Sequence, residues 1–332
     1  MPIRALYDRM QRLLGAIVLA GCGNNLPPTG TCDVPTSGKT VEVMPVALGD
    51  GGYFDDMRYS PELKKVVAAP IGNGHVYLID PDSLAVEMVN VPTTVSSADA
   101  SATTVYAKSS GGITAIDIAT GATVDTGIAG SPDYVRYSPM SNEVWVTVPG
   151  GNRIEILDPA TLAAIGSVIL PAPPEGLTIV NDRAYVNANG AVVAIDVARR
   201  ITVGQWDTGC GFSHGFPQVD LDYQLAFGGC FSNGGVGVTT MDGHLVSGIE
   251  AGGSEAIVAY NPTLHHLYVR GDPGSTLDLI ATCSDGQLGV MASVTIPNNG
   301  HGASADDRGH VWVADATTGG VLRVTDPFPA TN

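Results

Sequence analysis

Seven short segments of the chain carry side chains of the types used for acid–base chemistry and metal binding. Together they contain two histidines, two glutamates and two aspartates, and each lies where a run of strand-forming residues begins. Imidazole and carboxylate groups hold divalent cations and act as general acids and bases. A fold that gathers these segments would create a binding or catalytic site. The segments are Tyr53-Phe54-Asp55, Ser96-Ser97, Asp133-Tyr134, Glu175-Gly176, His214-Gly215, Glu255-Ala256 and His301-Gly302.

A repeated four-strand pattern connects these segments. Residues 133–171 contain four runs rich in Val, Ile, Tyr and Trp, separated by turn residues. Tyr59-Ser60-Pro61 recurs as Tyr137-Ser138-Pro139, and Asp80-Pro81 recurs as Asp158-Pro159, in both cases after 78 residues or two periods of 39. A period near 40 with four strands in each copy is typical of a β-propeller.

The number of copies predicts how the ring closes. A lone strand at residues 41–48 comes first, six four-stranded copies follow, and a seventh copy that begins at His301 ends after its third strand. We therefore expect an all-β, seven-bladed β-propeller with four antiparallel strands per blade. The N-terminal strand would complete the last blade and remove the open edge of the array. Copies two and five are irregular, so their boundaries are the least well marked.

The propeller geometry gives the seven segments a common location. Innermost strands all begin on one face, called here the upper face, so their first residues converge in a central funnel. The alternative is a structural role, in which these side chains only bond neighbouring backbone. The predicted funnel residues are Tyr53, Asp55, Asp133, Tyr134, Glu175, His214, Glu255 and His301, and the catalytic candidates among them are His214, His301 and Glu255.

The second strands of several copies resemble those of the YVTN-repeat, YncE-like propellers. The resemblance is carried by Val144-Trp-Val-Thr147, Ala184-Tyr-Val-Asn187, Leu267-Tyr-Val-Arg270 and Val311-Trp-Val-Ala314, and it covers roughly residues 40–326. It implies the fold more strongly than a function, since such propellers include binding proteins and related ones host lyases, lactonases and redox cofactors. Likeness to the lyases implies a role for His214 or His301 beside a metal, with Glu255 as the orienting residue. The Asn ligand that lactonase-like propellers use for calcium is absent from the seven segments.

The N-terminus predicts export and lipidation. Arg4, Arg9 and Arg12 precede a short apolar run, which ends in Leu19-Ala-Gly-Cys22 and resembles a bacterial lipobox. We expect residues 1–21 to be a lipoprotein signal peptide, Cys22 to be lipidated, residues 22–38 to form a tether and residues 39–332 to form the propeller. Multiple acyl chains give lasting membrane attachment. Gly23 implies, by resemblance, an outer-membrane address in the cell envelope.

The net charge argues against nucleic acid and anionic lipid headgroups as partners. Removal of residues 1–21 leaves 13 basic and 32 acidic side chains, a net charge of −19. Such a surface repels nucleic acid and anionic headgroups. We expect a monomer that meets the membrane through its lipid anchor.

The remaining cysteines can pair in an oxidising compartment. Cys210 and Cys230 both fall in upper loops, whereas Cys32 precedes the closing strand and Cys283 falls in a lower turn. The sequence therefore predicts Cys210–Cys230 and Cys32–Cys283 disulfides, with the alternative of four unpaired thiols, and it places the lower face toward the membrane. His265-His266 would be a solvated pair in another lower turn.

Three functions stay open from the sequence. The first is a non-enzymatic binding module that displays its upper funnel to a protein, a glycan or a small ligand. The second is a metal-assisted lyase or hydrolase acting in the same funnel, and the third is an envelope-assembly scaffold. No cofactor is expected beyond the divalent cation that the funnel residues are suited to hold.

Overall fold

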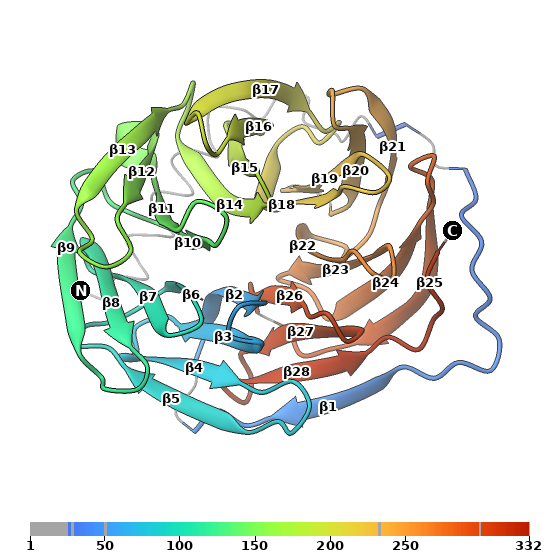
Figure 1. The fold of residues 1–332 in the computed structure, drawn as a ribbon. Coiled ribbons are helices and arrows are strands. Elements are labelled where there is room, and N and C mark those ends of the chain that lie inside the picture. Colours follow the sequence, from blue (N-terminus) through green and yellow to red (C-terminus); the bar gives the residue numbers. More distant parts are fainter. Residues whose placement is uncertain (1–25, 28–29, 50–51, 232–233, 299, 332) are drawn as a thin grey trace.

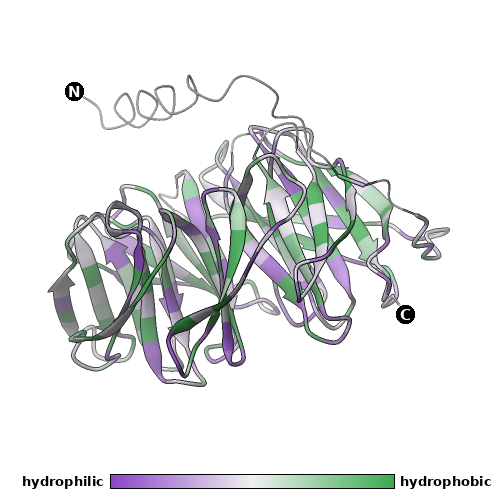
Figure 2. Ribbon diagram, turned by 90° about the horizontal axis from the view of Figure 1, so that it is seen from above, coloured by the Kyte–Doolittle hydropathy of each residue, from purple (hydrophilic) through white to green (hydrophobic). Residues whose placement is uncertain are grey.

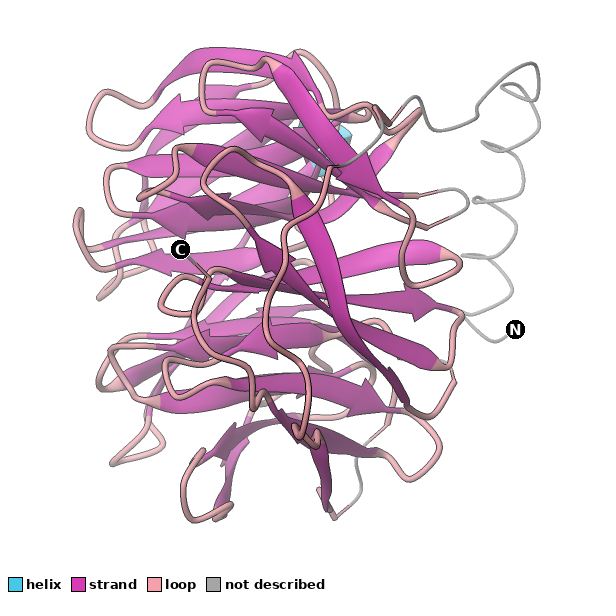
Figure 3. Ribbon diagram, turned by 90° about the vertical axis from the view of Figure 1, so that its right-hand side faces the viewer, coloured by secondary structure: helices cyan, strands magenta, loops and turns pink. Residues whose placement is uncertain are grey.

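The computed structural model describes residues 26–27, 30–49, 52–231, 234–298 and 300–331. Within them, 28 strands form seven four-stranded antiparallel sheets arranged as a ring (Figure 1). The only helical piece among these residues is the 3₁₀ turn Pro149–Gly151, and no described helix is long and apolar enough to cross a membrane (Figure 3). The predicted seven-bladed propeller is confirmed, including the irregular copies two and five.

Each of the first six blades follows the chain from the centre of the ring outward. The strands of blades one to three are β2 (Phe54–Ser60), β3 (Lys65–Pro70), β4 (His75–Ile79), β5 (Val86–Asn90), β6 (Ser97–Ala100), β7 (Thr104–Ser109), β8 (Gly112–Asp117), β9 (Thr123–Gly127), β10 (Val135–Ser138), β11 (Glu143–Val148), β12 (Arg153–Leu157) and β13 (Ala164–Ile169). Those of blades four to six are β14 (Pro174–Val180), β15 (Arg183–Ala188), β16 (Ala191–Asp196), β17 (Ile201–Asp207), β18 (Ser213–Asp220), β19 (Leu225–Cys230), β20 (Val236–Thr240), β21 (Leu245–Ile249), β22 (Glu255–Asn261), β23 (His266–Asp272), β24 (Thr276–Thr282) and β25 (Leu288–Thr295).

Blade seven closes the ring with strands from both ends of the chain. It contains β26 (Ala303–Ala305), β27 (His310–Asp315), β28 (Gly320–Thr325) and, as its outermost strand, β1 (Glu42–Val46). β1 pairs antiparallel with β28 in continuous register from Glu42↔Thr325 to Val46↔Val321. The predicted closure by the N-terminal strand is therefore confirmed.

The lower turns between third and fourth strands share one local design. In blade three, Asp158 accepts hydrogen bonds from the backbone N–H of Ala160 and Thr161 and from the Thr161 hydroxyl. Asp80 and Asp117 make the corresponding turns of blades one and two. These bonds stabilise the carboxylate form, so the pKa of each of the three aspartates is lowered. The repeated Asp in the sequence therefore fixes a turn.

The core is divided among the interfaces between blades. Trp145 of β11 is fully buried and packs with Leu177 and Val193 of blade four, while Trp312 of β27 packs with Met57 of blade one. Apolar residues are spread along the strands of the visible blades and do not gather in one central cluster (Figure 2). Because the apolar clusters lie between adjacent blades, an open ring would leave two apolar blade faces uncovered.

A buried ion pair joins blades one and three near the centre of the ring. Arg136 of β10 donates to both carboxylate oxygens of Asp56 of β2, at 2.6 and 2.8 Å, and its Nε donates to the carbonyl of Leu177 in blade four. Its guanidinium carbon lies 4.6 Å from the ring centroid of Phe216 in blade five. Ser97 of blade two donates its hydroxyl to Asp56. Residues of five blades thus meet at one buried charge pair.

The two histidines predicted to be a solvated pair are instead packed into the lower side, so that prediction is wrong. His266 is fully buried, with Nδ1 2.8 Å from Asp326 Oδ2. His265 stacks on Tyr223 at 4.1 Å and its Nδ1 lies 2.8 Å from Asp220 Oδ2. Both imidazoles find carboxylates from other blades or from the C-terminal segment, partners that a turn motif alone does not reveal.

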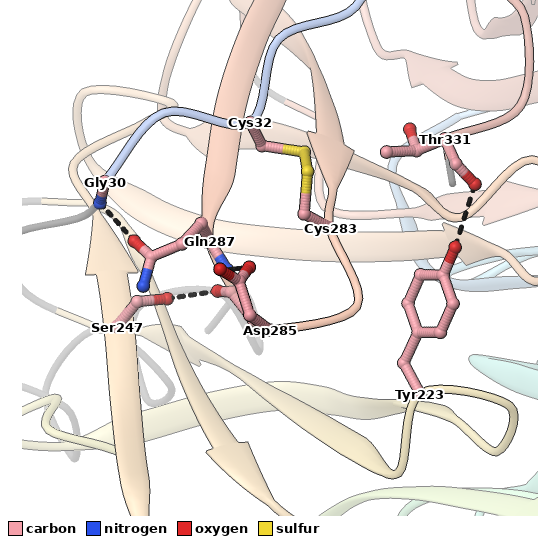
Figure 4. The surroundings of a disulfide bond; sticks show 9 residues. Gly30, Cys32, Tyr223, Ser247, Cys283, Asp285, Gln287 and Thr331 are labelled. Carbon is pink, nitrogen blue, oxygen red and sulfur yellow. Dashed lines mark hydrogen bonds between the residues drawn. A yellow bond between two sulfur atoms is a disulfide. The ribbon is translucent and has the colours of Figure 1, made fainter.

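Both predicted disulfides form. Cys210 pairs with Cys230 across the upper loops of blade five, and Cys32 pairs with Cys283 in the lower turn of blade six. Around the second bond, the Gly30 N–H also donates to the Gln287 side chain (Figure 4). The described part of the segment predicted as a tether thus lies against blades five and six. The signal peptide and Cys22 lie outside the described residues.

Candidate functional site

Three of the predicted funnel residues come together on neighbouring blades. His214 lies on β18, Glu255 opens β22, and His301 precedes β26. One ligand atom from each of these three side chains lies within 4.8 Å of the other two. The imidazole centroids are 6.0 Å apart. Since these residues begin the innermost strands of blades five, six and seven, their proximity follows directly from the ring. We call this group the His–Glu–His cluster.

His214 is held by two glutamates. Its Nδ1 contacts Glu255 Oε1, and its Nε2 lies 3.8 Å from Glu175 Oε2 of blade four. The ring packs edge-on against Phe231, 5.1 Å between centroids. Burial lowers the pKa of His214, but the contact with Glu255 and the charge of Glu175 outweigh it, so the net effect raises the pKa.

His301 is oriented by a residue that the sequence reasoning missed. Its Nδ1 lies 2.9 Å from Asp272 Oδ2, which also accepts a 2.8 Å hydrogen bond from the Tyr53 hydroxyl. The opposite ring nitrogen lies 4.0 Å from Asp55 Oδ1. Burial lowers the pKa of His301, but the hydrogen bond to Asp272 and the charges of Asp55 and Glu255 raise it to about 9.

Asp272 had a signal in the sequence that could have found it. It ends β23, the second strand of blade six, and its register partner is Glu255, the first residue of β22. Second strands end on the face where first strands begin, because the two are antiparallel. A polar residue at the end of a second strand therefore also reaches the funnel rim, and only the strand starts had been considered.

Three further carboxylates near the cluster, those of Asp55, Asp133 and Glu175, have raised pKa values. Burial, followed by the charges of Asp55 and Glu175, raises the pKa of Asp133 to about 7. Burial also raises the pKa of Asp55 and of Glu175, with partial compensation from the histidines. Lys108 lowers the pKa of both aspartates and donates to the Ser96 hydroxyl at 2.9 Å. The funnel thus holds more acid groups than its cations neutralise.

One predicted funnel residue, Tyr134, and one further residue of the seven segments, Ser97, pack into the body of the molecule. Tyr134 is buried and meets Phe216 edge-on, with 4.8 Å between centroids. Ser97 is buried and bonds Asp56, so it belongs to the central ion pair. Tyr53 is partly exposed while its hydroxyl reaches Asp272. Strand starts therefore supply both the funnel lining and the layer beneath it.

A separate cavity lies away from the funnel. It has a volume of about 580 Å³ and lies between the outer parts of blades four and five. Tyr185, Trp206 and Met241 are among its lining residues, and none of the predicted funnel residues is. Its polar and apolar lining groups do not converge on one point as the His–Glu–His cluster does, so we place the candidate site at the cluster.

Comparison with family models and with curated proteins finds no match for this chain. Solved structures show the fold. The structure titled "Structure of U3-55K" aligns with a TM-score of 0.72 at 8% identity, covering 86% of this chain and 98% of that one. Streptogramin B lyase aligns at 0.69 and 15% identity, covering 86% and 97%. Kuenenia stuttgartiensis hydrazine synthase aligns at 0.69 and 13%, covering 85% and 97%. At these identities the likeness shows a shared propeller architecture, and a fold alone does not assign a function.

The donor set of the cluster is suited to a transition-metal ion. Two imidazoles and one carboxylate match the preferences of Zn²⁺, Mn²⁺ or Fe²⁺, whereas Ca²⁺ prefers a shell of oxygen atoms. Three protein ligands leave coordination positions open. Asp272 would act from behind His301 as the group that fixes its tautomer and orientation. The arrangement can therefore hold a cation that also contacts a second molecule.

Proposed function

We propose that this chain is a membrane-anchored, extracytoplasmic propeller whose upper funnel binds a divalent transition-metal ion and, through its open positions, a small polar ligand. The observation that supports this most is the convergence of His214, Glu255 and His301 donor atoms within 4.8 Å. The anchor is supported by the lipobox-like Leu19–Cys22 and the apolar run before it.

The charges around the cluster favour a cation. Glu175 lies beside His214, and Asp55 and Asp272 lie beside His301. The charges of Asp55 and Glu175 also contribute to the raised pKa of Asp133. A divalent ion would relieve this repulsion between carboxylates. It would also replace the protons that the raised pKa values keep on His214 and His301, since a coordinating imidazole must be neutral.

Zinc or manganese is expected to raise the melting temperature of the chelator-treated chain, and the effect should grow with pH. His301 has a pKa of about 9. At pH 6 its imidazole therefore carries the proton that a metal ion must displace, and at pH 9 about half the molecules have lost that proton. For each proton displaced, the apparent Kd should tighten about tenfold per pH unit below that pKa. Calorimetric titration at pH 6, 7 and 8 measures this slope.

The matched variants are His214→Ala, His301→Ala and His244→Ala. His244 is exposed on the lower turn of blade five, beside Asp242 and away from the His–Glu–His cluster, so its loss should leave the metal response unchanged. Loss of either funnel histidine should weaken binding by at least about a hundredfold. Equal metal-induced shifts in all three variants would refute the proposed site.

A metal-assisted lyase or hydrolase is the second candidate, and the Tyr53–Asp272–His301 chain favours it. This chain places a hydroxyl and an imidazole, linked through one carboxylate, beside the three donors. Such a relay is suited to holding or moving a proton at a bound substrate. A propeller titled streptogramin B lyase shows that the architecture accommodates lyase chemistry.

Replacing Tyr53 with Phe distinguishes the two functions. The change removes only the hydroxyl and leaves the three metal donors in place, so metal affinity should stay within about threefold of wild type. A catalytic funnel should lose at least tenfold in turnover of whichever ester or lactone in a substrate panel it hydrolyses or opens. A panel without turnover in the metal-loaded wild type favours the binding function.

A further inference from the structure

We propose that the upper side of blade five rests on the bilayer that carries the lipid anchor, so that the funnel opens toward the membrane. The surface that would make this contact is Phe212 with Phe231, the upper aromatic pair. The inference rests on the proposed lipidation of Cys22. It reverses the orientation expected from the sequence, which placed the lower face toward the membrane.

The path of the N-terminal segment supports this orientation. Leu26 lies against the upper part of blade five, where a Cβ added at Gly248 would come within 2.7 Å of its side chain and one at Gly235 within 3.3 Å. Gly235 directly precedes β20, and Gly248 lies one residue from the end of β21. Both strand ends are upper, because Val236 pairs with Ile249 beside the upper loop that joins β19 to β20.

The chain between Leu26 and the proposed anchor is short. Four residue steps separate Cys22 from Leu26. A fully extended chain spans at most about 3.6 Å per residue, so the lipidated residue lies within about 14 Å of Leu26. The orientation expected from the sequence treats the Cys32–Cys283 bond, on the lower side, as the point where the N-terminal segment leaves the propeller. The contacts of Leu26 move the point of departure to the upper part of blade five.

The upper aromatic pair lies close to this point of departure. A Cβ added at Gly209 would approach the Leu26 side chain to 3.3 Å, and Phe212 follows in the same loop. Phe212 and Phe231 are 36% and 37% exposed, and their rings meet edge-on at 5.8 Å. The Cys210–Cys230 disulfide links the chain two residues before Phe212 to the residue directly before Phe231. Phe side chains that are about one-third exposed offer apolar surface of the kind that interfacial segments bury in a bilayer.

Exposed apolar side chains on the described loops are unevenly distributed between the two faces. Large ones outside strands lie mainly on upper loops, at Tyr53, Ile71, Phe212 and Phe231, whereas the lower loops present Met140. A bilayer on the upper side explains this asymmetry. The net negative charge of the mature chain restricts the contact to zwitterionic lipid, since anionic headgroups would repel it.

Tryptophan placed on each face tests the orientation. The lipidated full chain would be reconstituted on phosphatidylcholine vesicles, in the variants Phe212→Trp, Phe231→Trp and Met140→Trp. The native Trp145, Trp206 and Trp312 are buried, and their emission is subtracted with the wild-type protein. We expect the added emission at positions 212 and 231 to shift to the blue and to lose more than half its intensity with brominated lipid. Emission at 140, which is 62% exposed on the lower side, should not change.

The outcomes separate this inference from the proposed anchor. Equal quenching on both faces, or stronger quenching at position 140, overturns the orientation while leaving the anchor intact. A chain whose Cys22 carries no lipid overturns the anchor itself. Positions 212 and 231 report on the same surface. If one of the two Trp variants loses its native circular dichroism spectrum, the other variant still tests the orientation.

Discussion

Replacing Arg136 with Met is expected to lower the free energy of unfolding by about 3–5 kcal/mol. The guanidinium and Asp56 are both buried, and the variant leaves the carboxylate without its two charge-assisted bonds. The carbonyl of Leu177 also loses its donor. A buried charge without a partner costs far more than the intact pair contributes, which sets the size of the effect. Urea unfolding followed by circular dichroism measures it.

The double variant Asp56→Asn with Arg136→Met provides the control. It removes the lone charge, so most of the lost stability should return, and the coupling energy should be well above 1 kcal/mol. Additive effects of the two changes would show that the pair does not act as a unit. Arg153→Met is a matched control, because Arg153 pairs with Glu155 at a more exposed position and its loss should cost less than 1 kcal/mol.

Replacing Cys32 and Cys283 with Ser should destabilise the chain by about 4–5 kcal/mol. The bond closes a loop of sequence separation 251, so its removal returns a large conformational entropy to the unfolded chain. It also frees the segment that leads into β1, the strand that completes blade seven. Calorimetry should show a melting temperature lower by roughly 2–3 °C for each kcal/mol lost.

The Cys210–Cys230 bond offers a comparison within the same molecule. Its sequence separation is 20, so the loop-entropy model predicts a smaller loss, by about 2 kcal/mol, for the corresponding Ser pair. A melting temperature unchanged in the Cys32 and Cys283 variant would mean that strand pairing alone holds the N-terminal segment. A larger loss for the shorter loop would point to a local role for the upper disulfide.

The fold could be predicted because its information is local and repeated. Turn residues such as Asp158 recur at the same place in several copies, and counting copies gave the number of blades and the origin of the closing strand. Cys32 and Cys283 could be paired since the alternation of strands assigns each loop to a face. These inferences need only strand order and direction, which sequence periodicity provides.

The side-chain partners were harder to predict. Strand order gave the position of His301 but not Asp272, because the partner lies at the end of a different strand type. Arg136 looked like one more strand residue, and its pairing with Asp56 depends on how blades one and three face each other across the axis. Likewise, Leu26 was assigned to a tether, although glycines of blade five leave room for its side chain. Such contacts depend on three-dimensional distances that a repeat period does not contain.

The closing strand has a consequence for biogenesis. β1 is the first strand of the ring to be made, whereas its partner β28 is the last. A chain exported from its N-terminus would therefore have to expose every other strand before blade seven could form. During that interval β1 and the growing stack of blades would both present unpaired edges, which can pair with other chains.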